Sequence, residues 1–205
     1  MKLYFAPGTI SIAVAITLEE AELAYDTIKV DFATAEQTKA EYLALNPKGR
    51  VPTFVTTSGT RLTETGAILD YIATLVPDKC LVPTDAETAA HMRSIMYYLA
   101  STMHVNHAHK MRGHRWADAA SSLADMTAKV TETMTASAAY IEASAFLGDY
   151  VCGKNLTLAD PYLFVVCNWL AGDGVNVGDF PKISAFLDRM RRRPSVQKII
   201  AAGML

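Results

Sequence analysis

The first part of the chain alternates short apolar runs with longer stretches of helical periodicity. In the runs, apolar and polar residues alternate as in half-buried strands, whereas in the stretches apolar residues recur every three to four positions. The runs occupy residues 2–5, 25–31, 51–55 and 60–62, and the stretches occupy residues 9–23, 35–45 and 67–76. The first strand–helix–strand segment is long enough for a right-handed parallel crossover. The pattern predicts an α/β domain of βαβαββα order over residues 1–76.

The second part of the chain is helical in pattern throughout. Residues 77–83 contain two prolines and no periodicity, which indicates a linker. Apolar residues then recur at helical spacing over residues 92–103 and 123–141, and Pro181 begins a last amphipathic helix. We therefore expect an all-α domain over residues 84–205.

Two segments have the sequence of a capping box, in which a hydroxyl and an acid three residues later satisfy free amides at a helix start. The first joins Thr84 to Glu87, and the second joins Thr157 to Asp160. Both are expected to begin helices of the second domain.

Composition excludes several classes of function. Half of the 205 residues are hydrophobic and one fifth are charged, which is typical of a globular protein with a sizeable core. The net charge of −2 gives no basis for binding nucleic acid or an anionic membrane. No apolar run has the length of a membrane span. Pro7-Gly8 and Glu19-Glu20 interrupt the apolar N-terminal region, so we expect no signal peptide.

The three cysteines, Cys80, Cys152 and Cys167, are widely spaced and include no CxxC pair. An odd number without metal or disulfide spacing is typical of a reducing compartment, so we expect a cytoplasmic protein.

The strongest candidate chemistry lies in residues 46–65. Asn46-Pro47 and Lys48-Gly49 are turn dipeptides, and Val51-Pro52 begins an apolar run. A proline cannot donate to a sheet ladder, so it belongs at a strand start or an edge, where backbone is available to an extended peptide. Glu64-Thr65 places a carboxylate and a hydroxyl at a helix start. Together these features predict a site for a small peptide-like zwitterion.

The element order and four motifs together resemble the cytosolic glutathione S-transferases, most closely the bacterial beta class. The motifs are Met1-Lys2-Leu3-Tyr4, Ala6-Pro7-Gly8, Asn46-Pro47-Lys48-Gly49 and Leu156-Thr157-Leu158-Ala159-Asp160, and the likeness covers residues 1 to about 200. It implies a thioredoxin-like N-terminal domain, an all-helical C-terminal bundle and a homodimer. It also implies transfer of the glutathione thiolate to a small hydrophobic electrophile, with glutathione as co-substrate and no cofactor.

The resemblance assigns roles within the glutathione site. It implies a cis bond at Pro52 that presents the Val51 backbone to the cysteinyl part of the tripeptide. Glu64 and Thr65 would hold the γ-glutamyl end. Residues suggested for the glycine carboxylate are Lys48, Gln37 and Lys39. The alternative for Glu64 and Thr65 is a helix cap, and for the last three residues a solvated surface position.

The resemblance also requires a group that makes the thiol nucleophilic, since a thiol of pKa near 8.5 is only a few per cent ionised at pH 7. Ser11 stands where the beta class has a serine, and Thr9 and Tyr4 are alternative donors. The alternatives for Ser11 and Tyr4 are a first-turn serine and a packed aromatic. Ile10 stands where the class has its cysteine, which argues against a mixed disulfide with glutathione there. His104 matches a cleft histidine of the class, although Val105 replaces the lysine that often follows.

Further candidates lie in the helical part. Four histidines, His104, His107, His109 and His114, fall close together, but they lack the acid and cysteine spacing of a metal site, so we expect no metal. A pocket for the electrophile is expected from Tyr97, Met111 and Trp169; the alternative for these helix residues is a place in the core.

Two further functions remain open at this point. One is a catalytically weak glutathione-binding or interaction protein, because the class cysteine is missing. The other is a glutathione-dependent isomerase, dehalogenase or peroxidase on the same scaffold.

Overall fold

The computed structural model describes all residues 1–205 and groups them into two units. The first comprises Met1–Thr84 with Arg191–Leu205, and the second comprises Asp85–Met190. Each unit is described in turn.

A four-stranded mixed sheet lies at the centre of the first unit. Its strands are β1 (Lys2–Phe5), β2 (Asp26–Lys29), β3 (Thr53–Val55) and β4 (Arg61–Thr63), in the order β2-β1-β3-β4. β1 is parallel to β2, whereas β3 is antiparallel to both β1 and β4. Leu3 and Phe54 face each other in this register and are both fully buried. The predicted strands and the thioredoxin-like order are confirmed.

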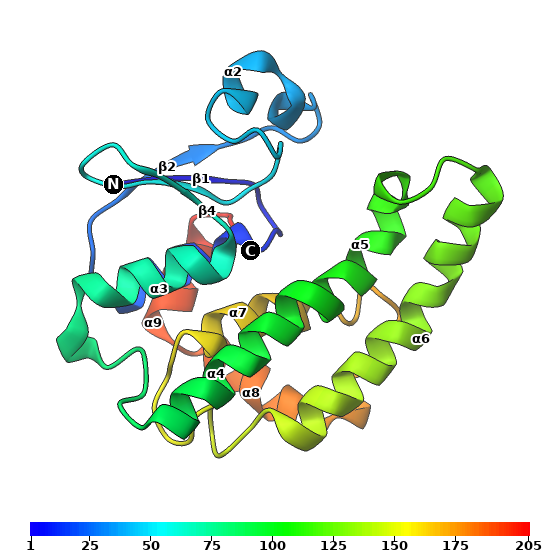
Figure 1. Ribbon diagram of the computed structural model, residues 1–205. Coiled ribbons are helices and arrows are strands. Elements are labelled where there is room, and N and C mark those ends of the chain that lie inside the picture. The colour runs from blue at the N-terminus through cyan, green and yellow to red at the C-terminus, as the bar shows by residue number, and fades with distance from the viewer. The chain divides into compact units, whose positions relative to one another are not determined.

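Helices cover both faces of this sheet. α1 (Ser11–Glu20), α3 (Thr65–Leu75) and α9 (Pro194–Ala201) lie on one side, and α2 (Ala40–Leu43) lies on the other, as Figure 1 shows. Two 3-10 turns, Glu36–Thr38 and Pro77–Lys79, complete the unit. α1 packs against both α3 and α9, and its residues 11–18 are all buried. A helix enclosed in this way is apolar on every side.

The structure contains one C-terminal helix that the sequence pattern does not predict. The sequence pattern ends the helices with the one that Pro181 begins, but α9 follows it with Pro194 in its first turn. Proline lacks the amide that a first turn leaves unbonded, so it starts a helix as readily as it stops one. Residues 191–205 also group with the first unit, whereas the sequence places them in the helical domain. The Gly8 amide, for example, donates to the Met204 carbonyl at 2.9 Å.

The second unit is entirely helical, as predicted. α4 (Ala86–Tyr98), a π-helical turn (Leu99–Met103) and α5 (His104–Arg112) follow one another without a break, and α6 (Ala120–Ser144) returns alongside them (Figure 1). The remaining elements are α7 (Ala159–Asn168), α8 (Pro181–Arg191) and the 3-10 turns Gly113–Arg115 and Val177–Asp179. Residues 159–167 of α7 are all buried. No helix of either unit is both long and apolar enough to cross a membrane.

The two expected caps differ in outcome. At α4 the expected Thr84–Glu87 box is wrong by one residue, because Asp85 is the cap: its carboxylate accepts from the amide and hydroxyl of Thr88 at 2.8 and 2.7 Å. The Thr157–Asp160 box is half formed: Asp160 accepts from the Thr157 amide at 2.7 Å as expected, but the Thr157 hydroxyl donates to the same carboxylate at 3.0 Å and caps no amide of α7. The capped amide at α4 is that of Thr88, three residues after Asp85, and a carboxylate accepts it more strongly than a hydroxyl would.

A charge network joins the end of α1 to the start of α9. The guanidinium of Arg193 donates from Nε and Nη2 to the two oxygens of Glu20 at 2.6 and 2.7 Å, and the Ser195 hydroxyl donates to the same carboxylate. The Glu20 side chain is 13% exposed. Burial by itself raises the pKa of Glu20, but the hydrogen bonds from Arg193 and Ser195 lower this pKa overall.

We predict that Glu20→Ala lowers the free energy of unfolding by about 1.5–3 kcal/mol near pH 7, because bonds to a charged group are lost. The folded pKa lies below the unfolded value, so this contribution is present above about pH 4.5 and is lost as the pH falls through the folded pKa. Urea unfolding at pH 7 and at pH 3 measures it. The control is Lys129→Ala, which breaks an exposed pair with Glu132 worth less than about 1 kcal/mol. Equal losses in the two variants would contradict the assignment.

Candidate functional site

Three loops of the first unit meet at one end of its sheet. Tyr4, near the end of β1, is paired with Thr53 at the start of β3, and Thr53 is paired with Thr63 at the end of β4. The antiparallel register therefore brings together the loop after β1, the loop before β3 and the start of α3. These loops carry Thr9 to Ser11, Asn46 to Pro52, and Glu64-Thr65, so the structure places the predicted glutathione-site motifs side by side.

A buried polar network fixes the loop before β3. The Tyr42 hydroxyl and the Asn46 amide both donate to the Arg50 carbonyl at 2.7 Å. Both side chains also hydrogen-bond the Thr53 hydroxyl, at 2.9 and 3.1 Å. Burial raises the pKa of Tyr42, which keeps its hydroxyl protonated as a donor. The network holds the backbone on both sides of Val51-Pro52, whose peptide bond is cis as the resemblance implies.

Sequence reasoning missed this network as part of the site. Its only signals were Asn46 in a turn dipeptide and Tyr42 on the inward side of a helix. Tyr42 is 3% exposed and Asn46 is 1% exposed. A buried asparagine needs partners for its amide, and these partners come from a strand that lies seven residues later.

The two candidate hydroxyls at the start of α1 are bonded to each other. Ser11 Oγ and Thr9 Oγ1 are 2.6 Å apart, and Thr9 Oγ1 donates to the Ala6 carbonyl at 2.7 Å. Ser11 Oγ also accepts from the Ala6 amide at 3.3 Å. Ser11 is fully buried, whereas Thr9 is partly exposed. Thr9 is therefore the hydroxyl that a bound molecule can reach, and Ser11 lies behind it.

The start of α3 carries the acidic candidate in an unusual backbone conformation. Glu64 has φ +70°, and Thr65, which is 6% exposed, is the first residue of the helix. Residues other than glycine rarely adopt a positive φ, and residues that do so cluster at binding sites. The ammonium of Lys48 lies 2.5 Å from the Glu64 carboxylate and donates to the Thr63 hydroxyl at 2.7 Å. Lys48 and Glu64, predicted for opposite ends of one ligand, thus contact each other.

Other candidates around this site have clear positions. The Tyr4 ring is half-buried and packs edge-on against Tyr42 at 6.2 Å. Gln37 is partly buried and Lys39 is exposed. Gly49 has φ +61°, and a Cβ there would approach the Gln37 carbonyl to 3.0 Å, so the turn requires glycine.

The histidines of the second unit form a cluster with Trp169. The His107 ring stacks on the indole at 4.2 Å, and the His104 ring meets it at 5.0 Å. His107 Nδ1 is 2.7 Å from the Asp173 carboxylate. His109 contacts Trp116 instead, so the four histidines do not converge. No group of three histidine, cysteine or acidic residues is placed to hold a metal ion.

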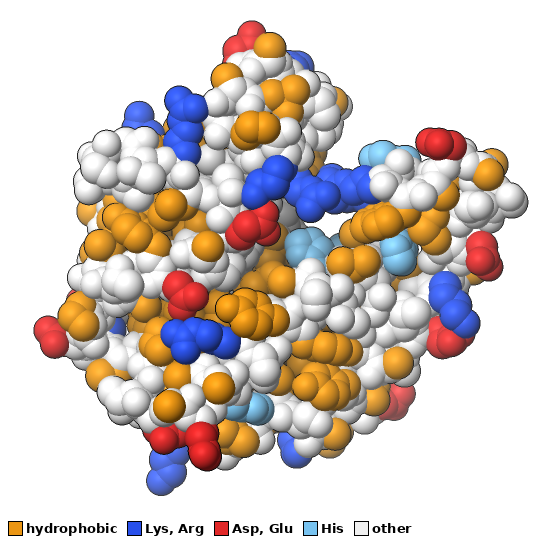
Figure 2. Space-filling view, viewed as in Figure 1, with side chains coloured by type: hydrophobic (Ala, Val, Ile, Leu, Met, Phe, Trp, Pro, Cys, Tyr) orange, Lys and Arg blue, Asp and Glu red, His pale blue; other side chains and the backbone are white.

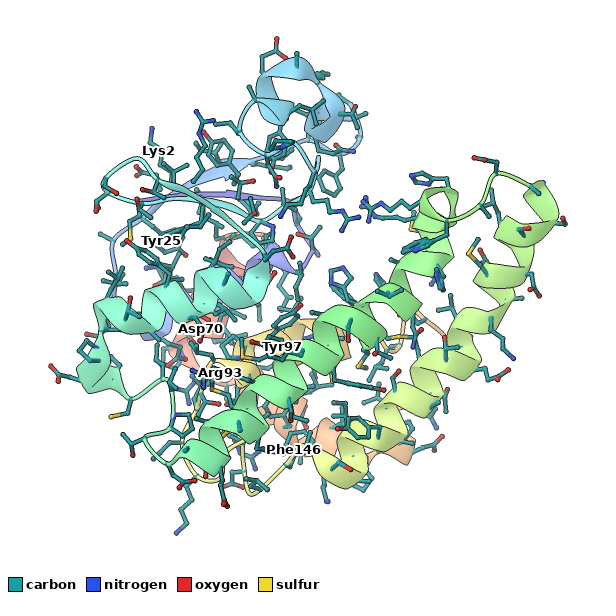
Figure 3. All side chains as sticks on the ribbon, viewed as in Figure 1. Lys2, Tyr25, Asp70, Arg93, Tyr97 and Phe146 are labelled. Atoms are coloured by element: carbon teal, nitrogen blue, oxygen red, sulfur yellow. The ribbon has the colours of Figure 1, made fainter.

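The expected pocket residues Tyr97 and Met111 are surface residues. Tyr97, which Figure 3 labels, is 65% exposed on α4. Met111 is 83% exposed on α5. Their alternative assignment to the core is therefore wrong. Trp169 is partly buried and contacts the histidines.

Neither Cys152 nor Cys167 is an activated nucleophile. Burial raises the pKa of both Cys152 and Cys167, so their thiols stay protonated near neutral pH. Cys80 is exposed, and all three cysteines are free of disulfides.

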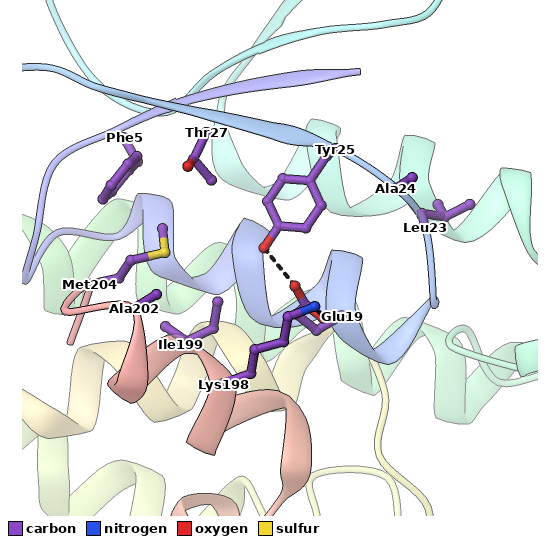
Figure 4. A pocket seen from close by; sticks show the side chains of 10 residues that line it. All are labelled: Phe5, Glu19, Leu23, Ala24, Tyr25, Thr27, Lys198, Ile199, Ala202 and Met204. Carbon is purple, nitrogen blue, oxygen red and sulfur yellow. Dashed lines mark hydrogen bonds and ion pairs between the residues drawn. The ribbon is translucent and has the colours of Figure 1, made fainter.

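A separate cavity of about 340 Å³ lies between the sheet and α9 (Figure 4). None of the predicted site residues lines it. Its polar side chains pair with one another: the Tyr25 hydroxyl donates to Glu19 at 3.0 Å, and Lys198 lies 2.7 Å from the same carboxylate. This cavity is distinct from the site at the loop ends.

Comparison with protein families assigns both parts of the chain. Residues 1–74 match the family "Glutathione S-transferase, N-terminal domain", and residues 93–194 match "Glutathione S-transferase, C-terminal domain". Glutathione S-transferase GstA of Escherichia coli O157:H7 is 30% identical, with 98% of each chain covered.

Solved structures agree with this assignment. A glutathione transferase homologue from Sulfitobacter, with bound glutathione, is 61% identical and has a TM-score of 0.98, covering 100% of this chain and 98% of the other. The beta-class glutathione S-transferase of Sphingomonas chungbukensis is 30% identical with a TM-score of 0.86, covering 99% and 98%. The resemblance seen in the sequence is confirmed: the chain belongs to the glutathione S-transferase family.

Proposed function

We propose that this protein transfers the thiolate of glutathione to small hydrophobic electrophiles. The observation that carries the proposal is the convergence of three loops at one end of the sheet, which joins a hydroxyl pair, a fixed backbone edge and an acidic helix start. The Sulfitobacter and sphingomonad relatives with bound glutathione support it.

Each loop supplies one part of the tripeptide site. The backbone of Val51, beside Pro52, bonds the cysteinyl part as an added strand does. Glu64 holds the γ-glutamyl ammonium, while Thr65 and the start of α3 hold its carboxylate. Lys48, with Gln37 and Lys39 nearby in the sequence, serves the glycine carboxylate.

This scheme requires Glu64 and Lys48 to exchange partners on binding. Their side chains are 71% and 42% exposed, and an exposed ion pair contributes only about 0–1 kcal/mol. The ligand replaces that pair with two charge-assisted contacts of its own, one at each end. The Lys48–Glu64 ion pair therefore competes only weakly with glutathione for these two side chains.

Residues at the start of α1 activate the glutathione thiol. On binding, Thr9 turns its hydroxyl proton from the Ala6 carbonyl to the sulfur, while Ser11 donates to the Thr9 oxygen and so orients it. The first turn of α1 adds the partial positive charge of a helix start. Ile10 offers no thiol for a mixed disulfide, so the site favours transfer over disulfide exchange. His104 takes a supporting role, and Tyr97, Met111 and Trp169 serve the electrophile.

The second candidate is glutathione binding with little turnover. It is favoured by the complete burial of Ser11, whose hydroxyl is occupied within its own loop. Two measurements separate the candidates: turnover of chlorodinitrobenzene and retention on immobilised glutathione. Retention with turnover supports the transferase, and retention without turnover supports the binding protein.

We also propose that the chain forms a homodimer. Apolar side chains gather over α4 and α6 on the face shown in Figure 2. Tyr140 is 40% exposed, and its ring lies 4.4 Å from that of Tyr98. A monomer rarely exposes a contiguous aromatic surface. Sedimentation velocity at micromolar concentration measures the particle mass, and a monomer there would refute the proposal.

We predict that Glu64→Ala weakens glutathione binding more than tenfold, because the ligand ammonium loses its charged partner. Glu64→Gln, which keeps the shape of the side chain at φ +70°, should weaken it similarly. Isothermal titration calorimetry measures the affinity. Glu41→Ala, an exposed acid on α2, is the control and should bind as the parent does. Unchanged affinity in folded Glu64 variants would show that this carboxylate does not hold the ligand.

We predict that Thr9→Val raises the pKa of the bound thiol by about 1–2, because a hydroxyl bond to a thiolate contributes about 1.5–3 kcal/mol. Ser11→Ala should raise the pKa less, since Ser11 acts through Thr9. Ultraviolet titration of the bound thiolate between pH 5 and 9 measures both, beside His104→Ala and the exposed control Ser58→Ala. A shift with Ser11→Ala alone would return the direct role to Ser11. No shift in any variant would leave the helix start as the only activator.

A further inference from the structure

The cavity between the sheet and α9 has the size of a small-molecule site. Its volume is about 340 Å³, and small-molecule sites in proteins range from about 300 to 1,000 Å³. All ten residues that line the cavity belong to the first unit, so its shape depends on that unit alone. None of them is a residue that we propose for glutathione, so a molecule bound here would occupy a second site.

Apolar side chains form most of the cavity wall. Figure 4 shows Phe5 reaching from β1 toward Ile199 of α9 and Met204, which follows that helix. These three residues are 8%, 2% and 3% exposed, so they form the buried part of the wall. Three further apolar residues, which are more exposed, complete it: Leu23, Ala24 and Ala202. A wall of this kind suits the apolar body of a small ligand.

One pair of opposite charges lies among the lining residues. Only Glu19 and Lys198 are charged, and Lys198 Nζ lies 2.7 Å from Glu19 Oε2. The Tyr25 hydroxyl donates to Glu19 Oε1 at 3.0 Å (Figure 4). Burial, together with the charge of Glu19, raises the pKa of Tyr25, so its hydroxyl stays protonated and continues to donate. The Glu19 carboxylate is therefore held in place beside the cavity.

The two charged partners differ in burial. The Glu19 side chain is 15% exposed, whereas that of Lys198 is 69% exposed. A lysine as exposed as this one moves into solvent at small cost, because an exposed ion pair is weak. A ligand cation would thus gain a fixed and mostly buried carboxylate. A ligand anion would gain only the exposed lysine, and it would lie beside the like charge of Glu19.

We propose that this cavity binds a small arylalkylamine. The ligand ammonium replaces that of Lys198 on Glu19, and the aromatic ring packs against Phe5, Ile199 and Met204. An ammonium has three donors and no acceptor, which suits a carboxylate that only accepts hydrogen bonds. The exchange also leaves the net charge of the cavity unchanged, because one ammonium leaves as another enters. Binding here does not require glutathione.

Binding of 2-phenylethylamine at pH 7, measured by calorimetry and by amide NMR shifts, tests the proposal. Two similar molecules, 2-phenylethanol and 3-phenylpropionate, keep the ring but carry no charge or a negative charge. The amine should bind at least about tenfold more tightly than either, because only the amine pairs with Glu19. The largest shifts should fall at Ala24, Thr27 and Ala202, which line the cavity.

Three variants examine the parts of the site separately. Glu19→Gln, which keeps an acceptor for Tyr25, should weaken amine binding about tenfold. Lys198→Ala should strengthen amine binding about two- to threefold, because it removes the competing ammonium. For a ligand carboxylate the same variant would weaken binding. Ala202→Phe, at an exposed lining position, should fill the cavity and abolish amine binding.

The matched controls are Glu132→Gln and Lys129→Ala, which alter an exposed ion pair away from the cavity. Both should bind the amine as the parent does. Equal affinity for the amine and the two similar molecules, unchanged affinity in Glu19→Gln, or weaker binding in Lys198→Ala would overturn the proposal. Displacement of the amine by saturating glutathione would place it in the glutathione site and would overturn the proposal as well.

Discussion

The site of the first unit depends on the hydrogen bonds that converge on Thr53 and the Arg50 carbonyl. Tyr42 and Asn46 both donate to the Arg50 carbonyl and both hydrogen-bond the Thr53 hydroxyl, and both side chains are buried. In this low-dielectric setting the bonds are strong, and leaving any one of them unmade is costly. They make one position of the loop before β3 much more stable than any other. The neighbouring register of β1 and β4 then brings the other two loops to the same end of the sheet.

The proposed ligand contacts are built largely from helix starts and loop backbone. The start of α1 presents a hydroxyl pair, and the start of α3 presents Glu64 with a positive φ. Free amides at a helix start favour negative charge, which suits both a thiolate and a carboxylate. Few charged side chains are then needed at the site.

Buried carboxylates recur as fixing points elsewhere in the chain. Glu20 binds Arg193 and Ser195 and so ties α9 to α1, and Asp160 binds the amides of Thr157 and Val151 before α7. Asp173 differs from these because its partner is a histidine that remains partly exposed. A carboxylate that bonds amides or arginine fixes structure only. One that bonds histidine also fixes a tautomer, which gives it a chemical consequence.

The sequence by itself determined the element order, the thioredoxin-like sheet, the helical second unit and the place of the Val51-Pro52 and Glu64-Thr65 motifs. These rest on local periodicity and turn chemistry, which a few neighbouring residues specify. The extent of the last helix, the cap at Asp85 and the grouping of residues 191–205 were decided by packing and by competing acceptors. The burial of Ser11 behind Thr9, the Tyr42–Asn46–Thr53 network and the His107–Asp173 pair were likewise set by tertiary structure. Each joins side chains through space, and the last pair lies 66 residues apart, so no local pattern reveals which partner a polar group finds.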